Sequence, residues 1–530
     1  MQQGVAKRGV LDYISPMDKK IRFSGVLLHP TSLYEEDGIG SFGKSSYDFV
    51  DFLSSANVGL WQILPLGPVG FGNSPYASRS TFAGNELLIS LDFLVDDNYL
   101  EFDDLKNRPT NRGDRINFEE VQNYKWPLLI KGANNFLLNA TKKEKDSYNS
   151  FCEKESYWLT DYALFQSITN FYNDSRWFKS WPTKLANRDK KELERWAKEN
   201  KDEIEVYKVL QYFFYSQWHQ LKEYANNKNI AIVGDIPIFV AHDSADAWTN
   251  RKILKLDEDG HLEASSGVPP DAFSETGQLW GNPLYDWPAM EKDNFSWWEE
   301  RLAFQFEQTD FVRIDHFRGF EAYWEVPSNH KTAQNGKWVK VDGQKLFDHF
   351  REKFGSLAVI AEDLGVITKE VEHLRDSNNF PGMKIAQFAF NQKGDELDSS
   401  NAYLPHNYSE RCVTYTGTHD NNTTRGWFDS LDPTLQDLVR RYLSCSSDSV
   451  SWHMMRSVMA SAAQFAIIPI QDLLDLGEEG RMNLPGTCGD ENWSWRLTAN
   501  QINRDLAMRL KDLTQFFGRD SGYVELKKLF

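Results

Sequence analysis

Carboxylate, guanidinium and imidazole side chains stand where several apolar runs of this sequence end. In TDFVRIDHFRG, residues 309–319, Arg313 and Asp315 close such a run and His316 follows at once. Side chains of a strand alternate between its two faces, so the spacing predicts that Arg313 and Asp315 project to the same side as an ion pair. A strand-end salt bridge without chemistry is the common outcome for such a pair. The rest of the chain has to decide between the two interpretations.

Other apolar runs end in the same way, at Asp235, at Glu362 and at His419 with Asp420. Each residue has a structural alternative, because Asp235 could cap a helix, Asp420 could form a turn and His419 could be a core histidine. Together they suit glycosyl chemistry, in which one carboxylate attacks an anomeric carbon and a second carboxylic acid protonates the departing oxygen.

The sequence neighbours of two carboxyl groups separate their roles. A guanidinium favours the ionised form of an adjacent carboxyl, so Arg313 is expected to hold Asp315 as a charged nucleophile. Glu362 follows the apolar LAVIA and has no basic neighbour in sequence. Desolvation is therefore expected to keep Glu362 protonated as the acid.

Eight apolar runs are expected to be the strands that position these residues. They lie at residues 23–32, 58–68, 230–240, 310–317, 357–365, 383–390, 412–420 and 464–472. Near-continuous apolarity is typical of parallel strands covered on both faces. Helix-like segments follow several runs, one of them capped by Thr368. Eight alternations favour an α/β fold, a (β/α)8 TIM barrel, whose strand ends converge at one mouth.

The spacing of the runs is uneven, which predicts large inserted subdomains on the C-terminal face of the barrel. We expect residues 1–530 to form a single catalytic unit. A largely helical insertion is expected at 69–229, between the second and third strands. A further insertion, at 241–308 between the third and fourth strands, is expected to carry a substrate-covering loop at 265–287.

Composition narrows the possible partners and the compartment. The formal net charge is −18, which argues against nucleic acid, because phosphate backbones are bound by positive surface. Four cysteines without a C-x-x-C pair predict neither a disulfide framework nor a zinc site. No apolar stretch is long enough for a signal peptide or a membrane span. A cytoplasmic protein is expected, and a plastid protein without its transit peptide is the alternative.

The motifs GDIPIFVA, RIDHFRG, AEDLG and TGTHDNNTT, in this order, resemble the four signature regions of the amylomaltases. These are 4-α-glucanotransferases, or disproportionating enzymes, of glycoside hydrolase family 77, related to the α-amylases. Further matches are LLHPTSL, WQILPLGP, GNSPY, VPPDAFSETGQLWGNPLYDW, FPGMK and RMNLPGT, so that the resemblance runs from about Gly25 to Arg496.

The resemblance implies a role for each site residue. Asp315 would be the nucleophile, Glu362 the general acid/base and Asp420 a third carboxylate that stabilises the transition state. The remaining substrate-binding residues would be Ser74, Tyr76, Asp235, Asp271, Phe273, Gln278, Trp280, Arg313, His316, His419 and Asn483. The implied substrates are α-1,4-glucans, maltooligosaccharides and glucose, and no cofactor or metal is expected.

Three other functions compete with this hypothesis. An α-amylase-type hydrolase would use the same carboxyl groups with water as the acceptor. A non-catalytic glucan-binding protein would not need both a nucleophile and an acid. A nucleotide-dependent transferase is disfavoured, because no phosphate-cradling glycine loop follows any expected strand. Whether the chain is a monomer or a homodimer is left open by the sequence.

Overall fold

The computed structural model describes residues 20–110, 112–270, 274–390, 392–393 and 396–529. Its centre is a parallel eight-stranded sheet in the order β10-β13-β14-β1-β2-β3-β6-β9. The strands are β1 (Phe23–Leu27), β2 (Leu60–Gln62), β3 (Ala231–Pro237), β6 (Phe311–Asp315), β9 (Val359–Ala361), β10 (Gly382–Ile385), β13 (Cys412–Tyr415) and β14 (Phe465–Pro469). Each of the eight apolar runs supplies one strand, so the prediction of eight strands is confirmed.

The sheet curls until its two edges meet. The backbone N–H of Ala361, the last residue of β9, donates to the carbonyl of Pro381, just before β10, at 3.0 Å. Strands such as β14 are buried at every position, because the barrel interior covers one face and helices cover the other. The TIM-barrel prediction is therefore confirmed.

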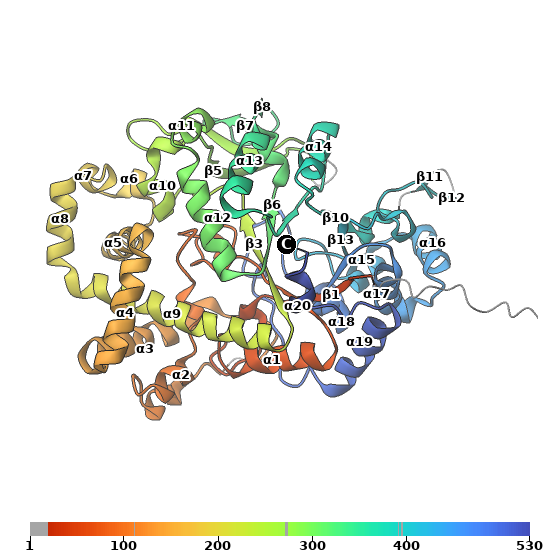
Figure 1. Ribbon diagram of the computed structural model, residues 1–530, viewed down its shortest axis with the longest axis horizontal. Coiled ribbons are helices and arrows are strands. Elements are labelled where there is room, and N and C mark those ends of the chain that lie inside the picture. The colour runs from red at the N-terminus through yellow and green to blue at the C-terminus, as the bar shows by residue number, and fades with distance from the viewer. Residues whose placement is uncertain (1–19, 111, 271–273, 391, 394–395, 530) are drawn as a thin grey trace, which may run out of the picture.

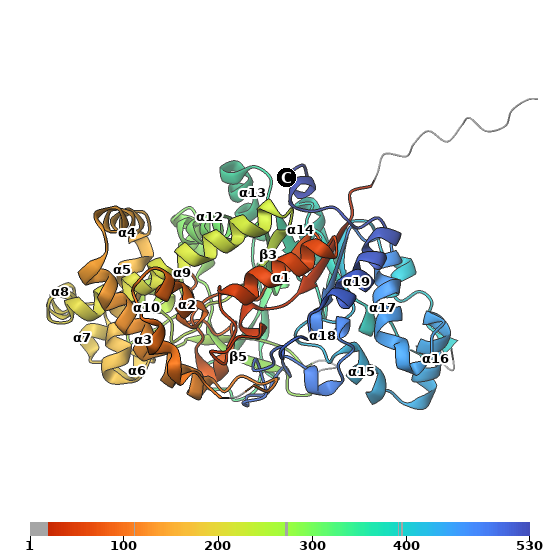
Figure 2. The ribbon, with the colours of Figure 1, turned by 90° about the horizontal axis from the view of Figure 1, so that it is seen from below.

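Helices cover the outside of the barrel and extend far to two sides. Helices α3 to α9 form a lobe on one side, and α15 to α17 with α19 lie on the other (Figures 1 and 2). The first half of the chain contributes α1 (Lys44–Ser55), α2 (Leu91–Asp96), α3 (Phe118–Asn139), α4 (Lys142–Lys154), α5 (Ser156–Tyr172), α6 (Trp177–Ser180), α7 (Thr183–Ala186), α8 (Lys190–Glu199), α9 (Lys201–Asn227) and α10 (Ala245–Thr249). The second half contributes α11 (Trp287–Lys292), α12 (Ser296–Gln308), α13 (Gly343–Phe354), α14 (Lys369–Ser377), α15 (Thr424–Ser430), α16 (Pro433–Leu443), α17 (Val450–Ala460), α18 (Ile470–Leu473), α19 (Arg504–Phe516) and α20 (Tyr523–Leu526).

Small sheets complete the fold. Strands β4 (Ala264–Val268), β5 (Gln278–Pro283), β7 (Ala322–Pro327) and β8 (Lys337–Lys340) form a four-stranded sheet in the order β5-β4-β7-β8. Strands β11 (Gln392–Lys393) and β12 (Glu396–Leu397) pair antiparallel. Among the residues described, no helix is both long and apolar enough to span a membrane.

One local prediction is confirmed in its position but not in its hydrogen bond. Thr368 occupies the N-cap of α14 with extended backbone, but its hydroxyl accepts no hydrogen bond from the helix. The Thr368 Oγ1 atom is buried without a hydrogen-bond partner in the described part of the chain. Residue type thus predicts the cap position here, but not the side-chain hydrogen bond that usually accompanies it.

Strand register carries the side chains of the site into one place. Asp235 of β3 lies beside Arg313 of β6, and Pro237 lies beside Asp315. On the other side of β6, Ile314 lies beside Ala361 of β9, so Glu362 follows one step beyond this pair. Since paired positions of adjacent parallel strands face the same side, the strand ends of β3, β6 and β9 present their charges to one mouth.

Candidate active site

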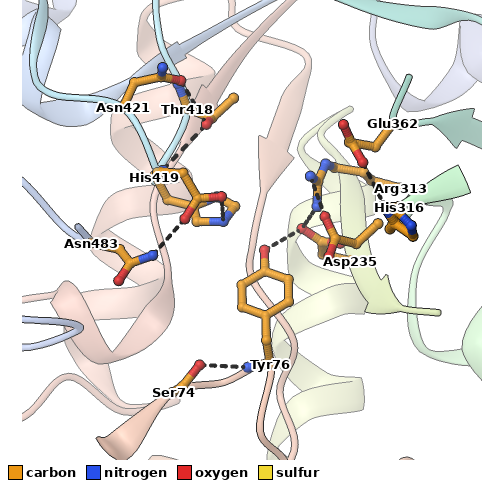
Figure 3. A network of polar contacts seen from close by, with 12 residues as sticks. Ser74, Tyr76, Asp235, Arg313, His316, Glu362, Thr418, His419, Asn421 and Asn483 are labelled. Carbon is orange, nitrogen blue, oxygen red and sulfur yellow. Dashed lines mark hydrogen bonds and ion pairs between the residues drawn. The ribbon is translucent and has the colours of Figure 1, made fainter. Parts of the chain in front are cut away.

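Arg313 joins two carboxylates at the end of β6. Its Nη1 donates to both oxygens of Asp235, at 2.8 and 2.6 Å, and its Nη2 donates to Asp315 Oδ1 at 2.7 Å. The Asp235 side chain is fully buried, whereas the Asp315 side chain keeps 31% of its surface exposed. Figure 3 shows the guanidinium of Arg313 directed at Asp235. The predicted ion pair is present, with a third member that comes from β3.

Glu362 lies directly after β9 and is held by backbone donors. Its Oε2 accepts from the N–H of His316 at 2.8 Å, and its Oε1 accepts from the N–H of Leu364 at 2.8 Å. Burial and the nearby charge of Asp315 raise the pKa of Glu362 to about 8, although Arg313 and the two N–H groups oppose the rise. Burial therefore favours the protonated form of Glu362.

His316 turns the chain at this point. Its φ of 54° is in the left-handed region, an uncommon conformation for a residue with a side chain, and such strain is concentrated at functional sites. Burial lowers the pKa of His316 to about 4, so the ring is neutral. Figure 3 shows His316 beside Glu362.

Asp420 comes from the loop between β13 and α15. Its Oδ1 accepts from Asn483 Nδ2 at 2.6 Å, and its Oδ2 lies 3.2 Å from His419 Nε2. Burial by itself would raise the pKa of Asp420, but His419 and the hydrogen bond from Asn483 outweigh it and lower the pKa to about 2. Asp420 is thus ionised over the whole neutral range.

Tyr76 lies between Asp235 and His419, the neighbour of Asp420. Its hydroxyl donates to Asp235 Oδ2 at 2.7 Å, and its ring stacks on His419 with centroids 5.2 Å apart. The Ser74 hydroxyl accepts from the Tyr76 N–H at 3.3 Å and fixes the turn that aims the ring inward (Figure 3). The loop after β2 therefore forms one wall of the mouth.

The four-stranded sheet reaches the mouth from the opposite side. Trp280 of β5 meets the His316 ring edge-on, with centroids 4.8 Å apart, and 36% of the tryptophan remains exposed. Gln278 Oε1 accepts from Trp280 Nε1 at 3.2 Å, which orients the indole. The two remaining residues that the sequence assigned to substrate binding, Asp271 and Phe273, lie outside the described residues.

The mouth thus combines Asp315 on its arginine, Glu362 with its raised pKa and Asp420 with its lowered pKa, beside aromatic rings. A protonated and an ionised carboxyl at adjacent strand ends are the requirements of retaining glycosyl transfer. In the ranges described, no group of three His, Cys, Asp or Glu side chains could hold a metal ion.

A family model described as 4-alpha-glucanotransferase matches residues 28–501 of this sequence. The chain belongs to this family.

Proteins named 4-alpha-glucanotransferase resemble the chain over nearly its whole length. One from Synechocystis sp. is 45% identical over 502 residues, covering 94% of this chain and 98% of the relative. One from Clostridium butyricum is 46% identical over 499 residues, covering 93% of this chain and all of the relative. Solved amylomaltases agree: that of Streptococcus agalactiae, in complex with acarbose, has a TM-score of 0.90 at 38% identity and covers 94% of this chain and 99% of its own.

Sequence reasoning missed two residues of this 4-alpha-glucanotransferase site. Trp493 lies against both Tyr76 and His419, at centroid distances of 5.7 and 5.8 Å, and Arg481 Nη2 donates to the carbonyl of Asp420 at 2.9 Å. Both come from the irregular segment after α18, where no periodicity marks a position as functional. Arg481 is the first residue of the resembling stretch RMNLPGT and Trp493 follows soon after it, which is the signal that could have found them.

Asp363 takes no part in the mouth, although it adjoins Glu362. Its Oδ1 accepts from the N–H of Met383 at 2.6 Å, and its Oδ2 accepts from Arg375. The side chain therefore fastens the end of β9 to β10 and to α14. Alternation along the chain explains the difference, because neighbours in an extended segment point to opposite sides.

Proposed function

We propose that this protein is a retaining 4-α-glucanotransferase that works through a covalent glycosyl ester on Asp315. The observation that carries the proposal is the contrast between the two carboxyls at the ends of β6 and β9. Asp315 accepts a hydrogen bond from the permanently charged Arg313, whereas Glu362 has a pKa raised to about 8. One group is ready to attack and the other is ready to donate a proton.

In the first half-reaction, a carboxylate oxygen of Asp315 attacks C1 of a glucose unit of the donor glucan. Glu362 gives its proton to the glycosidic oxygen O4 as the C1–O4 bond breaks. The reducing-end piece leaves with a free 4-hydroxyl. The rest of the donor stays attached to Asp315 as a β-glycosyl ester, and Glu362 is left as a carboxylate.

In the second half-reaction, the 4-hydroxyl of glucose or of another glucan takes the place of the leaving group. Glu362 removes its proton as the oxygen attacks C1, and the ester bond to Asp315 breaks. The new α-1,4 bond replaces the one that was broken, and both carboxyls return to their starting states. The reaction therefore needs no external energy source, cofactor or metal.

Asp420 supports the transition state in this proposal. Its pKa of about 2 keeps it negative, which favours the positive charge that develops at the anomeric centre. Asn483 and His419 hold the carboxylate from two directions, so that it also can accept hydrogen bonds from sugar hydroxyls in a fixed orientation. Tyr76 and Trp493 supply flat faces beside the same sugar.

Transfer requires that an acceptor hydroxyl react with the glycosyl ester faster than water does. We assign this task to the segment 265–287, whose Trp280 lies edge-on against His316 at the mouth. Exclusion of water together with a seated acceptor is worth several kcal/mol through positioning. The insertions at 69–229 and 241–308 thus belong to a single catalytic unit with the barrel.

The proposed substrates are α-1,4-glucans, maltooligosaccharides and glucose. The relatives are named 4-alpha-glucanotransferases, and the amylomaltase of Streptococcus agalactiae is described in complex with acarbose. A neutral substrate is compatible with the formal net charge of −18. The same sugars would act as donors and as acceptors.

The decisive experiment supplies maltotriose alone and follows reducing ends together with oligosaccharide sizes. A transferase should release glucose beside a ladder of longer oligosaccharides, while the number of reducing ends stays nearly constant. Each transfer breaks one bond and makes one. A rise of reducing ends in step with the loss of maltotriose, without longer products, would replace the proposal by an α-amylase-type hydrolase.

A further inference from the structure

Another wall of the mouth is formed by residues 479–496, which we call the wall segment. Its Asn483 donates to Asp420 Oδ1 at 2.6 Å, and its Trp493 packs against the ring of His419 with centroids 5.8 Å apart. Figure 3 shows Asn483 on the same side of the mouth as His419. All residues of the wall segment are described, and beyond the first two of them there is neither helix nor strand. Contacts with other parts of the chain must therefore fix its shape.

The wall segment doubles back on itself. The N–H of Trp493 donates to the carbonyl of Met482 at 2.8 Å, so two legs, residues 479–483 and 491–496, lie side by side. The φ of Trp493 is 63°, in the left-handed region that a bulky side chain rarely adopts. Such a conformation persists only where the surrounding structure holds it in place.

Arg115, from the insertion at 69–229, binds both legs of the wall segment. Its Nη1 donates to the carbonyl of Glu491 at 3.0 Å and to that of Arg481 at 3.4 Å. Its Nη2 donates to the carbonyl of Glu479. The guanidinium is planar and its donors point in fixed directions, so one rigid group sets the spacing of the two legs.

Backbone bonds from the same part of the insertion hold the second leg around Trp493. The N–H of Ile116 donates to the carbonyl of Ser494 at 2.7 Å, and Arg115 pairs with Trp495 in an antiparallel bridge. The carbonyl two residues before Trp493 is bound by Arg115, and the carbonyl directly after it is bound by Ile116. These backbone bonds reach the second leg, whereas the guanidinium reaches both.

We propose that Arg115 is a positioning residue for Asp420 and acts through the wall segment. By fixing the two legs, the guanidinium places Asn483 on the carboxylate of Asp420 and Trp493 on the ring of His419. Arg115 acts through backbone carbonyls, so it is not a catalytic residue. The inference rests on the proposed function in one respect, namely that Asp420 supports the transition state.

This role gives the helical insertion a part in the reaction. A displacement of about 1 Å at a catalytic group is enough to lower a rate about a hundredfold, even when its cause lies away from the chemistry. A tie that serves stability alone would have a different signature. Its loss would lower the melting temperature, and its effect on kcat would not depend on whether Asn483 is present.

The test is a double-mutant cycle between Arg115 and Asn483. Arg115→Met keeps a long side chain but removes the donors, and kcat for the release of glucose from maltotriose should fall at least about tenfold. In a chain that already carries Asn483→Ala, the same substitution should lower kcat by no more than about twofold, because the hold on Asp420 is already lost. Equal factors in the two chains, or a kcat of Arg115→Met within twofold of the unmodified protein, overturn the proposal.

Arg112 provides a matched control in the same loop. Its Nη1 donates to the carbonyls of Glu36 and Pro109, which lie outside the wall segment. Arg112→Met should therefore leave kcat within about twofold. A loss as large as that of Arg115→Met would show that any arginine tie in this loop has the same effect, and would overturn the proposal.

A second variant keeps the test decisive if Arg115→Met does not fold. Arg115→Lys retains the charge, but one ammonium cannot serve three carbonyls. It should lower kcat about fivefold in the unmodified chain and within twofold in the Asn483→Ala chain, and equal factors again overturn the proposal. Release of glucose counts transfer and hydrolysis alike, so the cycle is independent of the acceptor. The count of reducing ends in the unmodified protein tests the proposed function separately.

Discussion

The ends of β6 and β9 carry carboxyl groups with opposite surroundings. At β6, Asp315 shares the guanidinium of Arg313 with Asp235. At β9, Glu362 accepts hydrogen bonds from the uncharged N–H groups of His316 and Leu364. The two strands are neighbours in register, so the carboxyls lie at adjacent strand ends. They differ in burial as well as in charge, because the Asp315 side chain stays 31% exposed whereas burial is the largest cause of the raised pKa of Glu362.

This contrast shows how one mouth can hold an attacking anion and a proton donor together. A charged guanidinium stabilises the ionised form of a neighbouring carboxyl, whereas burial favours the protonated form of Glu362. The negative charge at Asp315 then adds to burial in raising the pKa of Glu362. The two environments are thus coupled, and a change at one strand end should be measurable at the other.

Loss of the nucleophile should have the largest effect. Asp315→Asn keeps the shape and the hydrogen-bonding reach of the side chain but removes the charge that attacks C1. Turnover of maltotriose should fall at least about a thousandfold, which corresponds to about 4 kcal/mol of transition-state stabilisation. Near-normal turnover by a contaminant-free preparation would remove Asp315 from the mechanism.

The effect of removing the acid on the rate should depend on the leaving group. Glu362→Ala should lower the turnover of maltotriose about as strongly as Asp315→Asn does, because the departing O4 then has no proton donor. With α-glucosyl fluoride, which leaves almost unassisted, the first step should recover at least about tenfold relative to maltotriose, and a glycosyl ester on Asp315 should accumulate for mass spectrometry. If both donors are slowed equally, Glu362 is not the acid.

Replacement of the Arg313 guanidinium at β6 should lower kcat by an intermediate factor. Arg313→Lys keeps a positive charge, but one ammonium cannot reproduce the planar fork that serves Asp235 and Asp315 together. Misplacement of the nucleophile should lower kcat by about a hundredfold. Arg441→Lys, at an exposed pair with Asp437, is the matched control and should leave kcat unchanged. Equal activity of both variants would show that charge alone suffices at β6.

The smallest effect should appear in the pH profile. With a Glu362 pKa of about 8, kcat/KM should fall tenfold per pH unit above pH 8, because the acid form disappears as the pH rises through its pKa. Removal of a like charge lowers a carboxyl pKa, so NMR of labelled Glu362 should show a lower pKa in Asp315→Asn. An unchanged value would mean that burial alone sets the pKa and that the strand ends are independent.

Local sequence patterns account for much of the barrel. Strands buried on both faces must be apolar throughout, and for this reason eight runs sufficed to predict eight strands. Alternation within a strand likewise suffices to place Arg313 and Asp315 on the same side of β6. The ordered motifs then indicate the family, because the chemistry of a barrel is concentrated at its strand ends.

Contacts between distant segments were decided only by the tertiary structure. Nothing in the sequence states that Asp235 lies beside Arg313, since inter-strand register arises from packing of the whole barrel. Asn483 and Trp493 reach Asp420 and Tyr76 from an irregular segment without periodicity. The sequence thus determined which groups are present and on which element each lies, whereas long-range packing decided which of them meet.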